Sequence, residues 1–205
     1  SLDVLNESFL YESSQLFSGS GSGEIVHLGT IACESGSVAL IGRRVKNDGI
    51  IEAPQGRTGI AVGAEVLLQP VGQPYIYIRS PVKADEASER EEAALSHSGS
   101  IQSLTAELKS ASSVYERAIQ CTGVIEALAV EERGGEVYLV AEGQTLEFSG
   151  KINASKSVQV QGSGSDASGT GVQLTGVSSI AVGDKGTISL RGSGGGKESS
   201  CGIDV

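Results

Sequence analysis

The sequence predicts an all-β fold, specifically a parallel β-helix (β-solenoid) made of stacked turns of short strands. A nine-residue pattern recurs five times along the 205 residues. Aromatic residues make up only 4% of the chain, which has 29 glycines and neither Met nor Trp. The core must therefore consist mainly of Val, Ile, Leu and Ala, and β-branched side chains pack well in stacked strands.

Each copy of the pattern has an aliphatic residue, then Gly four positions later, Ile two positions after that, and a small residue after another two. The copies are IVHLGTIAC (25–33), VKNDGIIEA (45–53), LSHSGSIQS (95–103), IQCTGVIEA (119–127) and LEFSGKINA (146–154). Residues two apart lie on one face of a strand, so the Ile and the small residue are expected to point inward together. The Gly fits a tight corner where the chain can require a positive φ.

A second alternating run follows most copies of the pattern. Its inward pairs are expected to be Val38/Leu40, Ile60/Val62, Val137/Leu139 and Val158/Val160. The repeat glycines are 20, 50, 24 and 27 residues apart, and the longest spacing suggests two periods. Such periods indicate stacked units that cannot bury their own apolar faces alone. About eight turns, spaced about 4.8 Å apart, would give a rod roughly 40 Å long.

One charged segment interrupts this rhythm. SPVKADEASEREEAAL (80–95) is predicted to leave the stack as a loop or as one or two helical turns. The Gly/Ser-rich stretches at 19–23, 162–171 and 192–197 predict connections between strands. The opening lacks a positive n-region, so no signal peptide is predicted. Because the chain contains no Met and its ending CGIDV reads like the start of another strand, we expect residues 1–205 to be one β-helical segment of a longer protein.

The formal charge of −10 and the pI of about 4.7 disfavour two classes of partner. Nucleic-acid-binding proteins present Lys/Arg-rich faces to phosphate, and attraction to anionic membranes also needs basic residues. The sequence contains no apolar run of the roughly 20 residues that a membrane-spanning helix requires. We therefore expect neither nucleic-acid binding nor a membrane span.

The stretch GSVALIGRRVKNDGIIEAPQGRTGIAVGAEVLL (36–68) resembles the β-helical repeats of bacterial filamentous-haemagglutinin-type exoproteins. The opening SLDVLNESFL and the following LFSGSGSGEIVHLGTI resemble the later part of their N-terminal secretion domain. Residues 1–70 are thus expected to match the end of that domain, and residues 71–205 to form further turns. The chain departs from the family pattern at Arg57–Thr58–Gly59, where an apolar residue and then strand residues are expected.

This resemblance implies a right-handed parallel β-helix that is secreted or displayed on the bacterial surface. It also implies export through an outer-membrane two-partner-secretion transporter, and an adhesin-like role with a host-surface or glycan receptor as partner. The leading interpretation is a non-enzymatic shaft and display segment. One alternative is a β-helical polysaccharide lyase or glycoside hydrolase, for which the few candidate catalytic residues are Arg43, Arg44, Arg79 and the acidic segment. The other alternative is a part of the secretion-recognition domain.

The sequence predicts no catalytic, cofactor-binding or metal-binding residue. His27 and His97 lie two positions before the repeat Gly, in a column shared with Asn47, Cys121 and Phe148, which indicates a corner position. Two His without further ligands do not make a zinc site. Glu52 and Glu126 share an outward column that also holds Ala32, Gln102 and Asn153, which is typical of a solvent-facing surface.

Four weaker patterns are interpreted as structural. The acidic residues of the interrupting segment could supply calcium ligands, but charge runs are usually solvated surface; they are Asp85, Glu86, Glu89, Glu91 and Glu92. GSGSD (162–166) is a single copy of a calcium-roll pattern, and GSGGGK (192–197) lacks the first Gly and the final Ser/Thr of a phosphate loop. Cys33, Cys121 and Cys201 have neither disulfide-framework nor zinc spacing and are expected to be small apolar residues.

Overall fold

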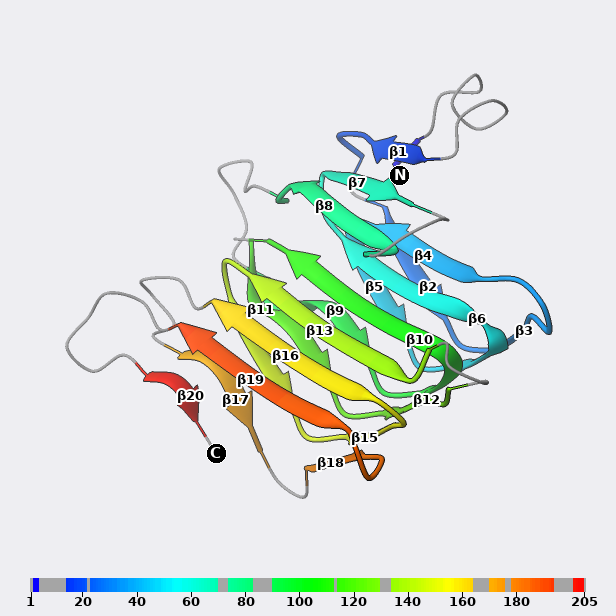
Figure 1. Cartoon of the computed structure of the whole chain (residues 1–205). Coiled ribbons are helices and arrows are strands. Elements are labelled where there is room, and N and C mark those ends of the chain that lie inside the picture. The colour runs from blue at the N-terminus through cyan, green and yellow to red at the C-terminus, as the bar shows by residue number, and fades with distance from the viewer. Residues whose placement is uncertain are drawn as a thin grey trace.

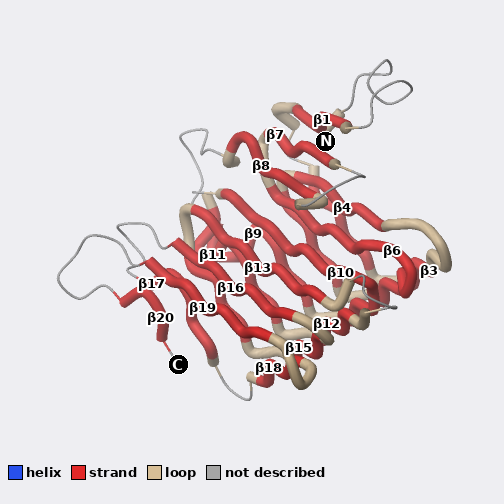
Figure 2. Tube along the Cα trace, viewed as in Figure 1, coloured by secondary structure: helices blue, strands red, loops and turns tan. Residues whose placement is uncertain are grey.

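A computed structural model describes residues 2–3, 14–21, 23–69, 74–82, 90–112, 114–129, 134–163, 170–175, 178–193 and 201–204. Over these residues the protein is all-β and contains no helix (Figures 1 and 2). Two large sheets with parallel pairing form the body of the molecule, and a small antiparallel sheet lies against it. The predicted all-β class is confirmed, and the parallel stacking is compatible with a β-solenoid.

Each turn of the chain contributes to both large sheets. The seven-stranded sheet has the order β2 (Glu24–His27), β5 (Arg44–Asn47), β9 (Arg90–His97), β11 (Tyr115–Cys121), β14 (Thr145–Phe148), β17 (Thr170–Leu174) and β20 (Cys201–Asp204). The ten-stranded sheet comprises β3 (Thr30–Ala32), β4 (Val38–Gly42), β6 (Ile50–Val62), β10 (Ser100–Ala111), β12 (Val124–Ala127), β13 (Glu136–Glu142), β15 (Lys151–Ala154), β16 (Ser157–Ser163), β18 (Ser179–Val182) and β19 (Thr187–Ser193). We call one pass through both sheets a rung.

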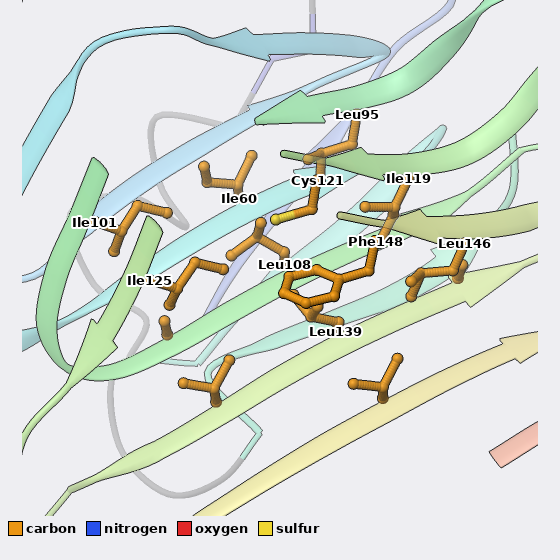
Figure 3. Packing of buried hydrophobic residues seen from close by; sticks show 14 of the residues in the cluster. Ile60, Leu95, Ile101, Leu108, Ile119, Cys121, Ile125, Leu139, Leu146 and Phe148 are labelled. Carbon is orange, nitrogen blue, oxygen red and sulfur yellow. The ribbon is translucent and has the colours of Figure 1, made fainter. Parts of the chain in front are cut away.

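The register confirms the repeat read from the sequence. Parallel pairing aligns the five repeat isoleucines in one column, which continues to Ile180; they are Ile31, Ile51, Ile101, Ile125 and Ile152. A second column aligns the aliphatic residues that open each copy, which are Ile25, Val45, Leu95, Ile119 and Leu146. The members from the internal rungs are fully buried and pack against one another in a single core (Figure 3). Each such side chain contributes about 1.5–3 kcal/mol of burial.

The inward faces of the second run are also confirmed, but one alignment differs. Val38 pairs with Thr58, and Leu40 pairs with Ile60. The partner of the pair Val38/Leu40 is therefore Thr58/Ile60, and the predicted pair Ile60/Val62 begins two residues later in the strand. The column continues through Leu108, Leu139 and Val160, all of which are fully buried. Sequence spacing placed the correct face inward, whereas the alignment of the strands follows from their pairing.

The repeat glycines serve close backbone approach and not a positive φ, which corrects the expectation from sequence. Among the described glycines, positive φ occurs at Gly134, Gly135 and Gly143, all in turns outside the repeat column. In the column, a Cβ added to Gly99 would lie 2.0 Å from the carbonyl oxygen of Gly49. That oxygen accepts a hydrogen bond from the amide of Ser100 at 3.0 Å. The stacked corners therefore leave no room for a side chain.

The long spacing between repeats does not contain an extra rung. β5 pairs directly with β9, and β6 pairs directly with β10, although residues 63–89 separate β6 from β9 in the chain. The prediction of about eight turns is therefore wrong for the described part of the chain, where one sheet has seven strands. Seven strands spaced about 4.8 Å apart span about 29 Å, which is shorter than the predicted rod.

The chain leaves the stack in a different place from the one predicted. β7 (Glu65–Leu68) and β8 (Ile76–Ser80) form a small antiparallel sheet with β1 (Gln15–Ser18), and we call these three strands the flap. The predicted excursion at 80–95 is wrong in its last part, because Arg90–His97 is β9 and forms part of a rung. Residues 83–89 lie outside the described residues. Hydrophobic periodicity could not place β9, because its first residues, Arg90, Glu91 and Glu92, are charged.

Candidate functional site

The flap packs on the outer face of the ten-stranded sheet through its own small apolar cluster. Val66, Leu68, Tyr75 and Ile76 are buried there with Ala61 of β6. Further apolar residues packed against this cluster are Leu2, Phe17, Ala39, Ile41 and Ile78. Because these outward residues of β4 and β6 are covered, this part of the sheet is buried on both faces. The junction between flap and stack thus has an apolar cluster of its own, separate from the main core.

A buried carboxylate anchors the start of β8. Glu107 of β10 points outward under the flap and is 1% exposed. Its two oxygens accept hydrogen bonds from the backbone amides of Tyr75 at 2.8 Å and Ile76 at 3.2 Å. Carboxylates are strong acceptors of backbone N–H groups, and these bonds compensate part of the cost of burying the charge. Glu107 thus fixes the flap at one point of the stack.

Lys109, two residues further along β10, completes this anchor. Its ammonium lies 2.7 Å from the Glu107 carboxylate and donates to the carbonyl oxygen of Ile76, also at 2.7 Å. The two side chains therefore bind both the N–H and the C=O of Ile76, as a neighbouring strand would. Unpaired edge groups of this kind favour association with other strands, so the Glu107–Lys109 pair also shields part of this edge.

The flap accounts for two residues of the irregular stretch Arg57–Thr58–Gly59, whereas Thr58 is buried in the inward column with Val38 and Ala106. The Arg57 guanidinium lies over the Tyr75 ring, 5.1 Å from its centroid. A Cβ at Gly59 would lie 2.3 Å from the Cδ1 of Ile76, so a larger residue there would displace the Ile76 side chain. Burial raises the pKa of the Tyr75 hydroxyl, and the nearby Arg57 charge opposes the shift. Two residues that look irregular for a β-helical repeat are thus part of the docking surface of the flap.

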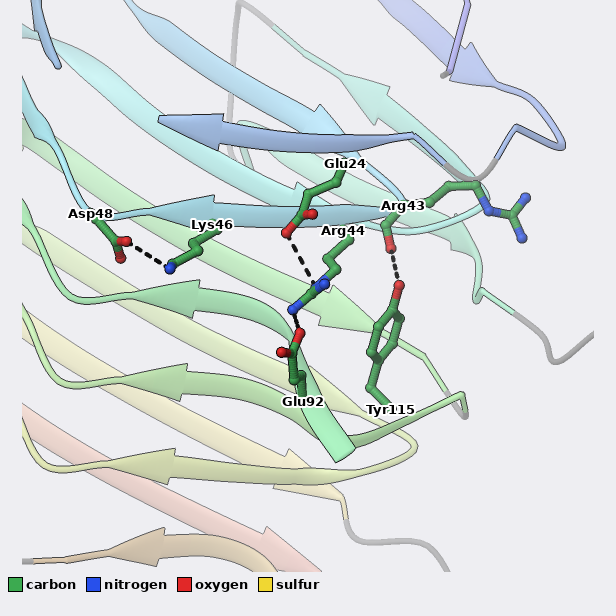
Figure 4. Close-up of polar contacts among 7 residues, drawn as sticks. All are labelled: Glu24, Arg43, Arg44, Lys46, Asp48, Glu92 and Tyr115. Carbon is green, nitrogen blue, oxygen red and sulfur yellow. Dashed lines mark hydrogen bonds and ion pairs between the residues drawn. The ribbon is translucent and has the colours of Figure 1, made fainter. Parts of the chain in front are cut away.

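The outer face of the seven-stranded sheet carries a paired row of charges (Figure 4). Arg44 lies between Glu24, 3.4 Å away, and Glu92, with which it forms an ion pair. The Arg44 guanidinium also lies 6.0 Å from the centroid of the Tyr115 ring. Such pairs on partly exposed surfaces contribute little stability individually, but they fix the charge pattern that a partner would meet.

A second part of this face lies at the corner of the rungs. Asp48 accepts a hydrogen bond from the Ser98 hydroxyl at 2.6 Å and pairs with Lys46 at 2.9 Å. These two contacts, with the Ser98 bond as the larger cause, lower the pKa of the Asp48 carboxyl below its ordinary value. Asp48 therefore stays ionised and acts as a surface link between adjacent rungs.

The candidates for catalysis are not brought together. Arg44 is held in the ion pairs of the seven-stranded sheet, and Arg43 donates to the carbonyl oxygen of Gly19 at 2.8 Å. Arg79 lies on β8 in the flap. Glu52 and Glu126 do share a column, as predicted, but Gln102 lies between them. They are therefore two rungs apart, about 9.6 Å by the strand spacing.

The acidic run and the two Gly/Ser-rich stretches, which were weighed as possible ligand sites from the sequence and discounted, fall largely outside the described residues. Asp85, Glu86 and Glu89 lie there, as do most of GSGSD (162–166) and GSGGGK (192–197). Of the remaining acidic run, Glu92 pairs with Arg44. Within the part of the chain that is described, no group of three or more His, Cys, Asp or Glu side chains is placed to hold a metal ion. The same residues include no helix long and apolar enough to cross a membrane.

The histidines occupy the corner column predicted from the sequence. The register aligns His27, Asn47 and His97, followed by Cys121 and Phe148. The sequence did not indicate that the three polar members are hydrogen-bonded in series, because this depends on their side chains pointing into one corner. The Asn47 amide lies 2.7 Å from the Nδ1 of His27 and 3.1 Å from the Nδ1 of His97.

Cys121 is fully buried, and burial raises the pKa of its thiol to about 12. Since the thiolate is the reactive form, we expect Cys121 to resist iodoacetamide at pH 8 in the folded protein and to react in urea. The measurement is mass spectrometry of the Cys33→Ser/Cys201→Ser variant. A variant that keeps only the half-buried Cys33 is the control, expected to react without urea. Equal labelling of Cys121 in the folded and unfolded protein would contradict this burial.

Comparison of the chain with protein-family models, curated proteins and solved structures finds no match.

Proposed function

We propose that this chain is a non-enzymatic shaft and display segment of a secreted or surface-exposed bacterial exoprotein of the filamentous-haemagglutinin type. In this proposal the stacked rungs are a right-handed parallel β-helix, which serves as the shaft. The flap is the element displayed on its side, with a host-surface protein or glycan as partner. An outer-membrane two-partner-secretion transporter exports the parent protein.

The observation that carries this proposal is the direct pairing of the rungs on either side of the flap. β6 and β10 stay in register from Ile50/Ser100 to Val62/Ser110, with one irregularity between Ser103 and Thr105. The chain leaves after the first of these strands and returns before the second without adding or losing a rung. A stack that accepts an insertion in this way supports a scaffold that holds other elements at fixed positions.

The anchoring of the flap also supports display. Glu107, Lys109, Arg57 and Gly59 are outward residues of the stack, and each contacts Tyr75 or Ile76. Tyr77, the next residue of β8, is 55% exposed. The flap is thus held by one face, while the other face presents side chains to solvent. The sequence resemblance is strongest over residues 24–68, which include the strands β4 and β6 beneath the flap.

The test is binding of the purified chain to arrays of neutral, sialylated and sulfated glycans and to immobilised extracellular-matrix proteins. In the comparison variant a short Gly/Ser linker replaces residues 65–80, so that Val82 keeps its place in the core beside Ser112. The variant also carries Ile41→Thr to lower the exposed apolar area. Circular dichroism and gel filtration check that the stack remains folded.

We expect the chain to bind at least one array component and the deletion variant to lose that binding. Tyr77→Ser is the matched point variant, because it changes the exposed flap surface without touching the anchor. Absence of binding by the folded chain would contradict display. Cleavage of an acidic glycan during the same incubation would contradict a non-enzymatic role.

A further inference from the structure

The corner column contains one chain of hydrogen bonds that crosses three rungs. His27 lies on β2, Asn47 on β5 and His97 on β9, in one register position. The Asn47 Oδ1 lies 2.7 Å from the Nδ1 of His27, and the Asn47 Nδ2 lies 3.1 Å from the Nδ1 of His97. The Nε2 of His97 lies 3.4 Å from the carbonyl oxygen of Val124. Asn47 and His97 are fully buried.

The carbonyl of Val124 fixes the direction of this chain. A carbonyl oxygen only accepts, so the Nε2 of neutral His97 must carry the proton and donate to it. The Nδ1 of His97 is then an acceptor, which the Asn47 amide group satisfies. The Oδ1 of Asn47 in turn accepts from a protonated Nδ1 of His27. The last atom of the chain, the Nε2 of His27, is buried and has no partner among the described residues.

We propose that His27, Asn47 and His97 form an acid-sensitive lock on the register of the rungs that flank the flap. A proton can be added to the free Nε2 of His27 without disturbing the chain. A proton added to His97 must enter at Nδ1, where it meets the N–H of Asn47. Asn47 can then bond to His97 only by rotating its amide, so that Oδ1 accepts from the new N–H of His97. The Nδ2 of Asn47 would then face His27, whose Nδ1 must lose its proton to accept. This lock does not depend on the proposed function.

The surroundings of His97 oppose its protonation. Burial lowers the pKa of His97 below its ordinary value, and hydrogen bonding to the backbone of Val124 and of Asn47, together with the charge of Asp48, opposes this shift. Asp48 is itself paired with Lys46 and Ser98. On the next strand the column holds Cys121, whose raised pKa keeps it neutral. Asp48 and Lys46 are therefore the charged groups placed to influence this corner, and the Asp48 charge is already neutralised in part.

The sign of the pH dependence follows from the lowered pKa of His97. The unfolded chain takes up the proton first, at about pH 6.5, so the lock stabilises the protein above this pH. As the pH falls below about 6.5, the unfolding constant rises, by up to tenfold per pH unit for one proton. The unfolding constant stops rising at the lower pH at which His97 is also protonated in the folded protein.

The test compares urea unfolding between pH 7.5 and 5 for the wild-type chain, His97→Gln and His27→Gln. Glutamine does not titrate and can accept a hydrogen bond from Asn47. His97→Gln is therefore expected to lose the pH dependence that His97 causes, which is up to a tenfold change in the unfolding constant per pH unit. His27→Gln is expected to keep the wild-type pH dependence of the unfolding constant, because His97 is unchanged. An unchanged slope in His97→Gln would overturn the proposal.

A second measurement on the wild-type chain keeps the test valid if a variant fails to fold. Nitrogen-15 shifts of the imidazole rings at pH 8 report which ring nitrogen carries the proton. The lock requires Nδ1–H at His27 and Nε2–H at His97. Nδ1–H at neutral His97 would overturn the proposal, because the chain would then run in the opposite direction.

Discussion

Replacing Glu107 with alanine is expected to lower the free energy of unfolding by about 3–5 kcal/mol, because it leaves a buried charge without its partner. Lys109 is only 13% exposed at its side chain and would lose the carboxylate 2.7 Å away. The amides of Tyr75 and Ile76 would lose their acceptor in the same variant. Urea denaturation followed by circular dichroism measures the change.

Two controls separate this effect from the loss of any outward carboxylate. Glu126→Ala changes a partly exposed carboxylate on the same sheet and is expected to shift stability by no more than about 0.5 kcal/mol. Glu107→Leu/Lys109→Leu removes both charges and is expected to recover part of the loss, since an apolar pair leaves no unpaired charge. A cost for Glu107→Ala no larger than that for Glu126→Ala would show that the anchor does not hold the flap.

Gly99→Ala is expected to destabilise the protein by about 2–4 kcal/mol. The added Cβ would lie 2.0 Å from the carbonyl oxygen of Gly49, and overpacking typically costs about 1–3 kcal/mol. Backbone movement to relieve the clash would also weaken the hydrogen bond from Ser100 to Gly49, which adds about 1 kcal/mol. The same denaturation experiment measures the loss.

Gly29 provides the matched control for this prediction. It occupies the same position of the repeat, but a Cβ there would meet no atom within 4 Å. Gly29→Ala is therefore expected to be near neutral. Equal costs at Gly29 and Gly99 would mean that glycine is required by the conformation of each corner and not by the stacking of one corner on the next.

The repeat could be predicted from the sequence because it has a local cause. Every rung must present inward aliphatic residues at the same positions, so spacing alone identifies Ile51, Ile101 and Ile125 as one column. The role of Gly99 could not be predicted in this way. Its constraint comes from the carbonyl of Gly49, which belongs to a different rung and is 50 residues away in the chain.

The flap could not be predicted because its strands pair and dock through long-range contacts. Leu67 and Tyr77 form a pair of β7 and β8, but the segment between these strands gives no short hairpin signal. Glu107 alternates with Leu108 as any solvent-facing residue would, so the sequence did not mark it as buried. Its burial depends on Tyr75 and Ile76, which come from the flap. The departure at Arg57 and Gly59 was the available signal that something covers this face.

The most direct test of this account is disulfide formation between neighbouring rungs, in a background with Cys33→Ser, Cys121→Ala and Cys201→Ser. Lys46 and Ser96 are paired outward residues of β5 and β9. Adjacent strands are about 4.8 Å apart, within the range that a disulfide spans, whereas positions two strands apart are separated by about 9.6 Å. Direct stacking of β5 on β9 predicts a disulfide in Lys46→Cys/Ser96→Cys and none in Val26→Cys/Ser96→Cys. Absence of the first disulfide in the folded protein would contradict direct stacking of the rungs on either side of the flap.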